Sequence, residues 1–372
     1  MIVGILGGGQ LARMLALAGT PLGLNFRFLD PQPDACAFPL GEALVGPFDD
    51  PSSLQNLARN ARVVTYEFEN VHVGGVEHLA RQVPLLPPPG ALAVKQDRLR
   101  EKQLFVELGL PTARFRPVQT ERDLREAAQA FGFPLVLKTR SLGYDGKGQR
   151  IVRGEEEMDG ALAPFGGSPL LAEEYVPFDR EVSVVAVRGT SGNIACYPLV
   201  ENVHHQGILH RSRPRPGDPF AASAAEYAQR LLTHFDYVGV LAVEFFQVGA
   251  RLLANEYAPR VHNTGHWTLE GAETSQFENH LRAILGFPLG ATSAVRPVVM
   301  INCIGGLPDR ARLLEIPGAH LHAYGKPPRP GRKVGHVTLR ATDERDLEEK
   351  LEKVKRVFTD SGLWPSASPP PR

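Results

Sequence analysis

The sequence predicts a protein of mixed α/β and α+β class with several domains, and three observations support this prediction. The first 90 residues alternate short apolar strands with helices, which is typical of a parallel α/β unit. The middle of the chain contains an apolar hairpin that carries two glutamates, Glu244 and Glu256. A length of 372 residues is too great for one ordinary core and allows two or three domains.

The composition is that of a globular protein without a strong electrostatic bias. Hydrophobic residues make up 43% and charged residues 22%, and 41 basic side chains balance 41 acidic ones. We therefore expect neither nucleic acid nor an anionic membrane as a partner. Cys36, Cys196 and Cys303 have no paired spacing, and Gln10 and Arg13 interrupt the apolar start of the chain. These features predict reduced thiols, no signal peptide or membrane span, and a cytoplasmic protein.

Residues 1–90 are predicted to form a Rossmann-like parallel α/β domain. A short apolar strand runs into a triple-glycine turn and then into a helix. Gly7, Gly9 and Ala12, with Asp30 at the end of the next strand, imitate the dinucleotide fingerprint. Because one glycine-rich turn is a weak signal, an NAD-dependent oxidoreductase is a rival hypothesis and not the main one.

The second half of this domain is predicted as a helix at residues 52–60, a strand at 63–68 and a helix at 74–81, followed by a proline-rich linker at 87–90. Glu67 and Glu69 come at the end of their strand, where open α/β sheets bind ligands. A solvated loop and a contact to substrate are equally open for these two acids.

Residues 91–290 are predicted to form the central domain, with helices at 97–108 and 121–131 and a strand at 134–139. Lys138 lies on that apolar strand, and a buried lysine should face an anion. The loop that follows contains three glycines and Lys147, so backbone amides can approach phosphate oxygens. Because it lacks the Walker spacing, we interpret it as a mobile flap over a triphosphate.

The next strands are predicted at residues 170–175, 181–187 and 195–200. The first ends in acids, which permits contacts to an adenine edge and to ribose hydroxyls. His204 and His205 are predicted to lie in a loop, and His262 and His266 are four residues apart. Neither pair has the spacing of a zinc site, so zinc is not favoured.

The hairpin consists of predicted strands at residues 240–247 and 251–257 around a tight turn. If the turn centres near Gly249 and Ala250, Glu244 and Glu256 are equally far from it and pair side by side. Like charges in this position repel, so a cation should lie between them. Oxygen ligands alone favour Mg2+.

Residues 291–360 are predicted to form a small, mostly β C-terminal domain with strands at 298–304, 320–324 and 335–341 and a closing helix at 343–358. Residues 361–372 are expected to be a frayed tail. A dense basic loop at 326–333 has no nearby acid in the sequence, so we favour a phosphate clamp over a solvated turn.

The order of these parts resembles the ATP-grasp superfamily, and jointly its motifs resemble the N5-carboxyaminoimidazole ribonucleotide synthetase family. The similar segments cover nearly the whole chain up to about residue 341. They are Gly7-Gly-Gly-Gln-Leu11, Tyr66-Glu-Phe-Glu-Asn70, Gln96-Asp-Arg98 with Glu101-Lys-Gln103, Gly143-Tyr-Asp-Gly-Lys-Gly-Gln149, Asn255-Glu-Tyr-Ala-Pro-Arg-Val-His-Asn263 and Arg329-Pro-Gly-Arg-Lys-Val-Gly-His336. The resemblance implies an ATP-grasp fold, with a two-part ATP-grasp domain between the N-terminal and C-terminal domains.

The resemblance also implies an activity, in which 5-aminoimidazole ribonucleotide, ATP and bicarbonate give N5-carboxyaminoimidazole ribonucleotide, ADP and phosphate in purine biosynthesis. The cofactors would be ATP and Mg2+. ATP would convert bicarbonate to carboxyphosphate, and the amine would then attack carboxyphosphate or the CO2 released from it. It further implies a homodimer and a separate mutase that takes the product onward.

Site residues follow from the same resemblance. ATP would be bound by Arg98, Lys138, Leu142, Gly143, Tyr144, Asp145, Gly146, Lys147, Gly148, Glu173, Glu174, Tyr175, Val176, Glu181, His204, Asn255 and Glu256. Glu244 and Glu256 would carry the metal ion, and the catalytic residues would be Arg260, His262 and Asn263, which hold bicarbonate, with Lys138. The ribotide would be bound by Gln10, Leu11, Glu67, Tyr144, Lys326, Arg332 and Lys333. The family often has glycine where this chain has Leu142.

Three alternatives remain open from the sequence alone. One is another ATP-grasp ribotide ligase, such as the formate-dependent glycinamide ribonucleotide transformylase, which would share the nucleotide site. The second is the NAD-dependent oxidoreductase built on the glycine-rich turn. The third is a non-catalytic nucleotide-binding regulator, which the glutamate pair and the lysine loop disfavour.

Overall fold

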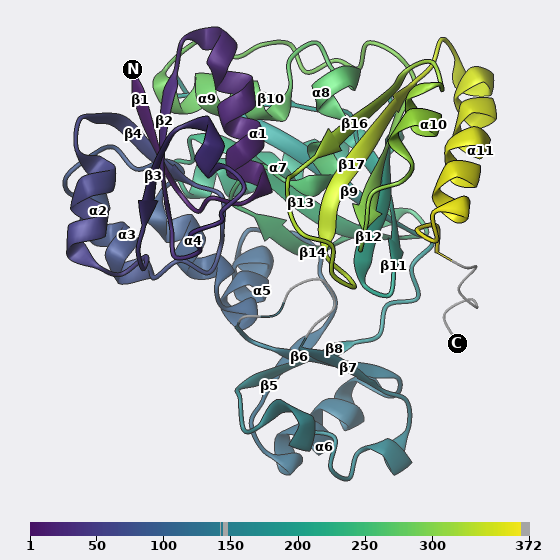
Figure 1. The fold of residues 1–372 in the computed structure, drawn as a ribbon. Coiled ribbons are helices and arrows are strands. Elements are labelled where there is room, and N and C mark those ends of the chain that lie inside the picture. The colour runs from purple at the N-terminus through teal and green to yellow at the C-terminus, as the bar shows by residue number, and fades with distance from the viewer. Residues whose placement is uncertain (142, 144–147, 366–372) are drawn as a thin grey trace.

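The computed structural model describes residues 1–141, 143 and 148–365, and Figure 1 shows their arrangement around three sheets. The N-terminal sheet is parallel in the order β3-β2-β1-β4. Its strands are β1 (Ile2–Leu6), β2 (Asn25–Asp30), β3 (Glu42–Val45) and β4 (Ala61–Tyr66), and its helices are α1 (Gln10–Gly19), α2 (Pro51–Ala58) and α3 (Val73–Ala80). The predicted Rossmann-like unit is confirmed.

The segment between this domain and the next is more ordered than the sequence predicted. The proline-rich linker leads directly into helix α4 (Pro89–Lys95), with Pro88 at its N-cap position, and α5 (Arg98–Glu107) follows. Proline suits the first helical turn, where its missing N–H has no partner to lose. The linker prediction is therefore wrong from Pro89 onward, and α4 carries Lys95 into the site described below.

A small antiparallel sheet forms a lobe that lies apart from the rest of the molecule in Figure 1. Its strands are β5 (Phe115–Val118), β6 (Leu135–Thr139), β7 (Gln149–Val152) and β8 (Leu170–Glu174), in the order β5-β8-β6-β7. Helix α6 (Glu121–Phe131) packs its apolar face on this sheet through Leu124 and Ala127. Lys138, the predicted phosphate-binding lysine, lies on β6, one of the two central strands of this sheet.

The largest sheet has nine strands and contains both the hairpin and the C-terminal strands. Its order is β14-β13-β9-β11-β12-β15-β17-β16, and β10 pairs with β9. The strands are β9 (Arg180–Arg188), β10 (Ile194–Cys196), β11 (Val200–His205), β12 (Ile208–Pro214), β13 (Gly239–Val248), β14 (Arg251–Ala258), β15 (Val298–Ile304), β16 (Ala319–Ala323) and β17 (Lys333–Arg340). Because β12 pairs with β15, the C-terminal β segment continues the central sheet.

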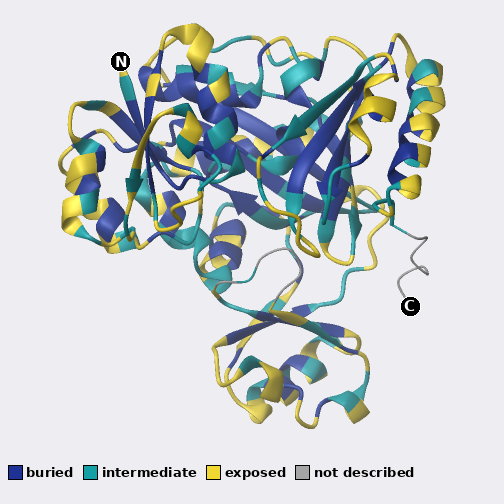
Figure 2. Ribbon diagram, viewed as in Figure 1, coloured by how far each residue is buried: buried dark blue, intermediate teal, exposed yellow. Residues whose placement is uncertain are grey.

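Helices cover both faces of this sheet, and its strands are largely buried in Figure 2. Val182 and Val184 pack against α7 (Ala221–His234), whereas Val185 and Val187 face α9 (Gln276–Leu285) and α1 of the N-terminal domain. This alternation is the period of a strand buried on both sides. Helices α8 (Thr268–Gly271), α10 (Arg310–Leu314) and α11 (Glu344–Asp360) complete the C-terminal part.

Two further predictions need correction or refinement. His204 and His205 do not lie in a loop but end strand β11, which returns as β12 through a turn at Gln206 and Gly207 with φ of 51° and 77°. Two successive positive φ values are those of a hairpin turn, and glutamine is an unusual residue there, which hid the signal. Near the C-terminus, Trp364 belongs to the predicted frayed tail but packs against Phe358 of α11. Residues 366–372 of that tail lie outside the described residues.

Within the described ranges, none of the helices combines the length and the apolar character needed to cross a bilayer.

Candidate active site between the two antiparallel sheets

The hairpin places Glu244 directly opposite Glu256, as predicted, but not for the predicted reason. A regular two-residue turn that pairs Val248 with Arg251 would set Glu244 against Asn255. The register shifts between Glu244 and Phe245, so Asn255 is an extra residue and Glu256 becomes the partner. A β-bulge therefore creates the acid pair.

The two carboxylates differ strongly in their surroundings. Burial and the neighbouring Glu256 raise the pKa of Glu244 to about 7. Burial would also raise the pKa of Glu256, but Lys95 and Arg98 outweigh it and lower that pKa. The Lys95 Nζ lies 2.7 Å from Glu256 Oε2, and Arg98 Nη1 lies 3.7 Å from the same oxygen. The pair as a whole favours one negative charge more than two, unless a further cation is bound.

This chemistry fits Mg2+, which takes oxygen ligands and is held in many sites by one or two carboxylates together with substrate phosphates. No three His, Cys, Asp or Glu side chains of the described residues gather to hold a metal by themselves. Glu244 and Glu256 fit an Mg2+ ion whose remaining ligands would come from outside these two side chains, such as the phosphates of ATP. The two histidine pairs considered for zinc provide no such group within those ranges.

Lys138 of the small lobe is 9% exposed, and its Nζ lies 2.9 Å from Glu173 Oε2. Lys102 of α5 lies 3.6 Å from the same oxygen. Although burial opposes it, the two lysines lower the pKa of Glu173 to about 2. Two of the predicted ATP-binding residues are therefore an ion pair, in which Glu173 fixes the position of the lysine ammonium.

The predicted flap is described only at its two ends. Gly143 O accepts a hydrogen bond of 3.2 Å from Arg98 Nη2, and Gly148 O accepts one of 2.7 Å from Thr139 N. Gly143, at the start of the loop, is thus held beside Arg98, which is predicted to bind ATP. The predictions for Leu142, Tyr144, Asp145, Gly146 and Lys147 lie outside the described residues.

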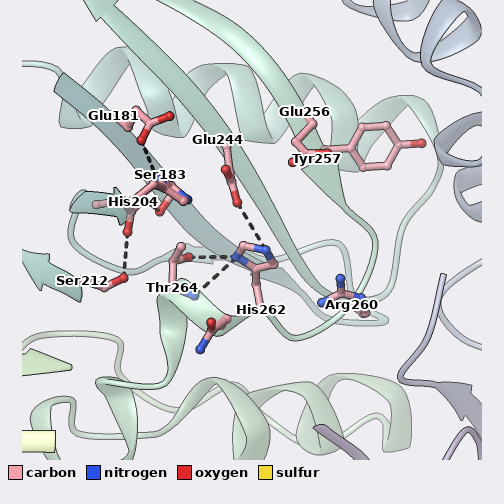
Figure 3. Close-up of polar contacts among 12 residues, drawn as sticks. Glu181, Ser183, His204, Ser212, Glu244, Glu256, Tyr257, Arg260, His262 and Thr264 are labelled. Atoms are coloured by element: carbon pink, nitrogen blue, oxygen red, sulfur yellow. Dashed lines mark hydrogen bonds and ion pairs between the residues drawn. The ribbon is translucent and has the colours of Figure 1, made fainter. Parts of the chain in front are cut away.

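The other predicted nucleotide residues lie on β8, β9 and β11 and on the connection from β8 to β9. Glu181 Oε2 and His204 Nδ1 form an ion pair, drawn in Figure 3, which raises the pKa of His204 although burial opposes the shift. Glu174 accepts hydrogen bonds from Arg114, and Tyr175 and Val176 are partly exposed. The structure therefore brings Glu181 together with His204.

The segment after β14 places Arg260, His262 and Asn263 beside the acid pair. His262 Nε2 lies 3.3 Å from Glu244 Oε1, as Figure 3 shows, and burial, with Arg260 second, holds its pKa well below the usual range. Thr264 N donates to His262 Nδ1, so the proton of the neutral ring is on Nε2, facing Glu244. Arg260 Nη2 lies 2.7 Å from Glu69 Oε1 of the N-terminal domain.

The backbone of this segment is held by Gln276, which sequence reasoning missed. Gln276 is fully buried and accepts from His262 N at 2.9 Å while donating to His262 O at 2.6 Å. Lys95 was also absent from the predicted site, and for Glu69 the sequence left a solvated loop and a contact to substrate equally open. Each residue reaches the site through tertiary packing, and Glu69 alone had a local signal, the end of its strand.

The glycine-rich turn is occupied by the protein's own acids. Glu67 accepts from the amides of Gly9, Leu11 and Ala12 at 2.9, 3.1 and 3.3 Å. Asp30 Oδ2 accepts from Gly8 N at 2.7 Å. The amides are the donors that a dinucleotide pyrophosphate would need, and Asp30 is the acid that its ribose would need. The structure therefore argues against the NAD hypothesis.

Two predicted ribotide residues nevertheless meet at this turn. Lys326 Nζ donates to Gln10 Oε1, and burial lowers the pKa of that lysine. Arg332 Nη1 donates to Pro327 O at 3.3 Å. The positive charge of Lys333 is one of the smaller causes that lower the pKa of His262, and it opposes the rise in the pKa of His204. The basic loop thus reaches the glycine-rich turn of the N-terminal domain through Lys326.

Three family models match the chain in the order of its domains. They describe a ribonucleotide synthetase preATP-grasp domain at residues 1–96, an ATP-grasp domain at 103–277 and a phosphoribosylaminoimidazole carboxylase C-terminal domain at 298–350. The N5-carboxyaminoimidazole ribonucleotide synthase of Pseudomonas aeruginosa is 52% identical over 358 residues, which cover 96% of this chain and 99% of that protein. The chain belongs to this synthase family.

Solved structures agree with the family assignment. The synthetase from Thermus thermophilus is 56% identical, covers 96% of this chain and 98% of its own, and superposes with a TM-score of 0.92. An Aspergillus clavatus synthase solved with ADP and 5-aminoimidazole ribonucleotide is 31% identical, with coverage of 96% and 98% and a TM-score of 0.90.

These findings confirm the predicted family, the ATP-grasp fold and the enzyme class. The chain is an ATP-dependent ligase of purine biosynthesis that carboxylates 5-aminoimidazole ribonucleotide. The transformylase, oxidoreductase and regulator alternatives are set aside.

Proposed function

We propose that the carboxyl donor is bicarbonate, that the reaction passes through carboxyphosphate, and that the residues predicted above carry it out. The supporting observation is that the Arg260 segment follows directly on the hairpin and contacts the acid pair. Arg260 comes two residues after β14, and His262 contacts Glu244. A nucleotide phosphate held at the acids would therefore lie beside a small anion held at Arg260, His262 and Asn263.

Bicarbonate is a poor electrophile, so it must be activated before an amine can attack it. In the proposed step, a bicarbonate oxygen forms a bond to the γ-phosphorus of ATP while the bond to ADP breaks. Lys138 and Arg98 offset charge on the phosphates, and Glu173 keeps the Lys138 ammonium in place. Mg2+, held by Glu244 and Glu256, would supply further charge compensation for the triphosphate.

The residues around the anion differ in charge. Arg260 provides a permanent cation with a forked set of donors, whereas burial keeps His262 neutral. The amine of the ribotide then forms the new carbon–nitrogen bond, and phosphate leaves. A pocket that excludes water protects the activated intermediate from hydrolysis.

The ribotide site is proposed at the junction of the N-terminal domain and the basic loop. Gln10 and Lys326 already contact each other there, and Leu11 is buried at the start of α1. Lys326, Arg332 and Lys333 would bind the 5′-phosphate, while Glu67 acts through the turn that it caps. Tyr144 completes the proposed set from the sequence resemblance.

We further propose a cytoplasmic homodimer whose product passes to a separate mutase. The resemblance supports the dimer and the mutase. The three cysteines, all of which lie among the described residues and are free thiols, agree with a reducing compartment.

Release of ADP tests the proposed function. It should require both bicarbonate and 5-aminoimidazole ribonucleotide, and omission of either should reduce the rate to background. Glycinamide ribonucleotide with formate serves as the comparison substrate pair. Stimulation by that pair, or release that is indifferent to bicarbonate, would contradict the proposal.

A further inference from the structure

Asn302 lies on β15 in the C-terminal part of the sheet and is 1% exposed. Its Nδ2 donates to Leu209 O at 2.8 Å and to Asn263 Oδ1 at 2.8 Å. Its Oδ1 accepts from Asn263 Nδ2 at 3.1 Å. Asn302 and Asn263 therefore form a two-bond amide pair, with a third bond anchoring Asn302 to β12.

The anchor determines which way both amides point. A backbone carbonyl can only accept, so Leu209 O requires the nitrogen end of Asn302 on its side. The oxygen end of Asn302 then faces Asn263 and requires the nitrogen end of that amide. Turning the Asn263 amide by half a rotation would set nitrogen against nitrogen and oxygen against oxygen, and both bonds would be lost.

The pairing uses one N–H and one oxygen lone pair of Asn263. Among the described residues, no further hydrogen bond uses the second N–H or the second lone pair of Asn263, a side chain that is only partly buried. An amide with a fixed orientation offers a donor in a known place without a reorganisation cost when an anion arrives.

We propose that Asn302 is a positioning residue, which orients Asn263 so that its remaining N–H donates to the anion held beside Arg260 and His262. This inference rests on the proposed function of the Arg260 segment as the bicarbonate site. It also means that β15, the strand that carries Asn302, orients the Asn263 side chain that donates to bicarbonate.

The chain offers a matched control for the loss of a buried amide. Asn279 of α9 is also fully buried and donates to Tyr197 Oη at 2.8 Å and to Gly290 O at 3.2 Å, while accepting from Gly290 N at 2.8 Å. None of these partners belongs to the Arg260 segment. Asn279→Ala should therefore reproduce a general loss of stability without the specific effect.

The test measures ADP release against bicarbonate concentration at saturating ATP and ribotide, for the wild type, Asn302→Ala and Asn279→Ala. We expect Asn302→Ala to raise the KM for bicarbonate by about tenfold and to leave the KM for ATP unchanged. Asn279→Ala should leave both values unchanged. An unchanged KM for bicarbonate in Asn302→Ala, or an equal rise in Asn279→Ala, would overturn the proposal.

A double-mutant cycle with Asn263→Ala separates positioning from other effects. If Asn302 acts only through Asn263, then Asn302→Ala should add no further change to the KM for bicarbonate in the Asn263→Ala background. Additive effects would overturn the inference. Asn302→Ser, which keeps one hydroxyl, replaces the alanine variant in the cycle if that variant does not fold. Wild-type ADP release that ignores bicarbonate would count against the proposed function itself.

Discussion

Two pairs of acids in this molecule differ in what surrounds them. At the glycine-rich turn, Asp30 and Glu67 accept hydrogen bonds from four successive or nearby backbone amides. At the hairpin, Glu244 and Glu256 face each other across two strands. Glu256, unlike Glu244, forms ion pairs with a lysine and an arginine, Lys95 and Arg98. The first pair is satisfied within the protein, and the second is satisfied only in part.

This difference separates a structural acid from a ligand-binding acid better than residue type does. Both pairs lie at places where ligands commonly bind, one at the carboxyl end of parallel strands and one between two sheets. The turn has no free amides for a phosphate at the positions that Glu67 fills. At the hairpin the two carboxylates favour one negative charge over two, and a cation bound with its substrate would allow both to ionise.

The largest effect is expected from breaking the hairpin pair. Glu256→Gln should lower ATP turnover by about a thousandfold or more, because a neutral amide cannot replace a carboxylate that contacts Lys95 and Arg98 and that we propose to bind Mg2+. Steady-state ADP release measures the loss, and circular dichroism should show an intact fold. Glu201→Gln, which changes another ion-paired glutamate of the same sheet, is the matched control. Near-normal turnover in Glu256→Gln would refute the metal role.

The turn should respond in stability more than in chemistry. Glu67→Ala leaves the amides of Gly9, Leu11 and Ala12 without their acceptor, so we expect a loss of about 1–3 kcal/mol in the free energy of unfolding. Urea denaturation measures this loss. Glu77→Ala, at an exposed position in the same domain, should change it little. The idea of a self-satisfied turn fails if Glu67→Ala is as stable as this control.

A steric change at the same turn should have a smaller effect. A Cβ at Gly9 would lie 2.5 Å from Glu67 Oε1, so Gly9→Ala must push the carboxylate away from part of its amide cradle. We expect a loss of about 1–2 kcal/mol in the free energy of unfolding. Gly90→Ala is the control, because nothing lies within 4 Å of the added methyl group and the position is helical. Equal stability of the two variants would contradict the close contact.

The sequence predicted the strands of the hairpin and the acids on them, because alternation and a tight turn are local signals. The bulge at Asn255 was not predictable, since it is a feature of how β14 pairs with β13 and not of the residues of either strand alone. Glu67 could be placed at a strand end, but its contact with α1 exists only because β4 lies beside β1 in the sheet. A local pattern cannot specify that neighbour.

Residues that support the site from far away in sequence were missed for the same reason. Lys95 lies 161 residues from Glu256, and Asn302 lies 39 residues from Asn263. Nothing in their immediate sequence marks them, because a lysine ending a helix or an asparagine in a strand is common. The family motifs supplied the residues that we propose to contact substrates, whereas packing supplies the residues that hold those in place.

The smallest expected effect concerns the link between the two regions. His280 of α9 connects two strands. One is β4, which it contacts at Thr65, two residues before Glu67, and the other is β13, which carries Glu244. Val240 N donates to its Nδ1 at 3.1 Å, so the proton is on Nε2, which lies 2.9 Å from Thr65 Oγ1. Burial lowers the pKa of His280 to about 3, so the folded protein keeps this ring neutral at pH values where the unfolded chain protonates it.

The sign of the pH dependence follows from this shift. Between pH 7 and 6 the unfolded chain binds more protons than the folded one, so acidification should lower the free energy of unfolding, by about 0.7 kcal/mol from this histidine. The loss continues as the pH falls toward the folded-state pKa of about 3. Urea denaturation at pH 7 and pH 6 should therefore show a smaller drop for His280→Gln than for the wild type. His78→Gln, at an exposed position, is the control and should keep the wild-type drop in the free energy of unfolding. An equal drop in all three proteins would show that His280 does not make stability depend on pH in this range.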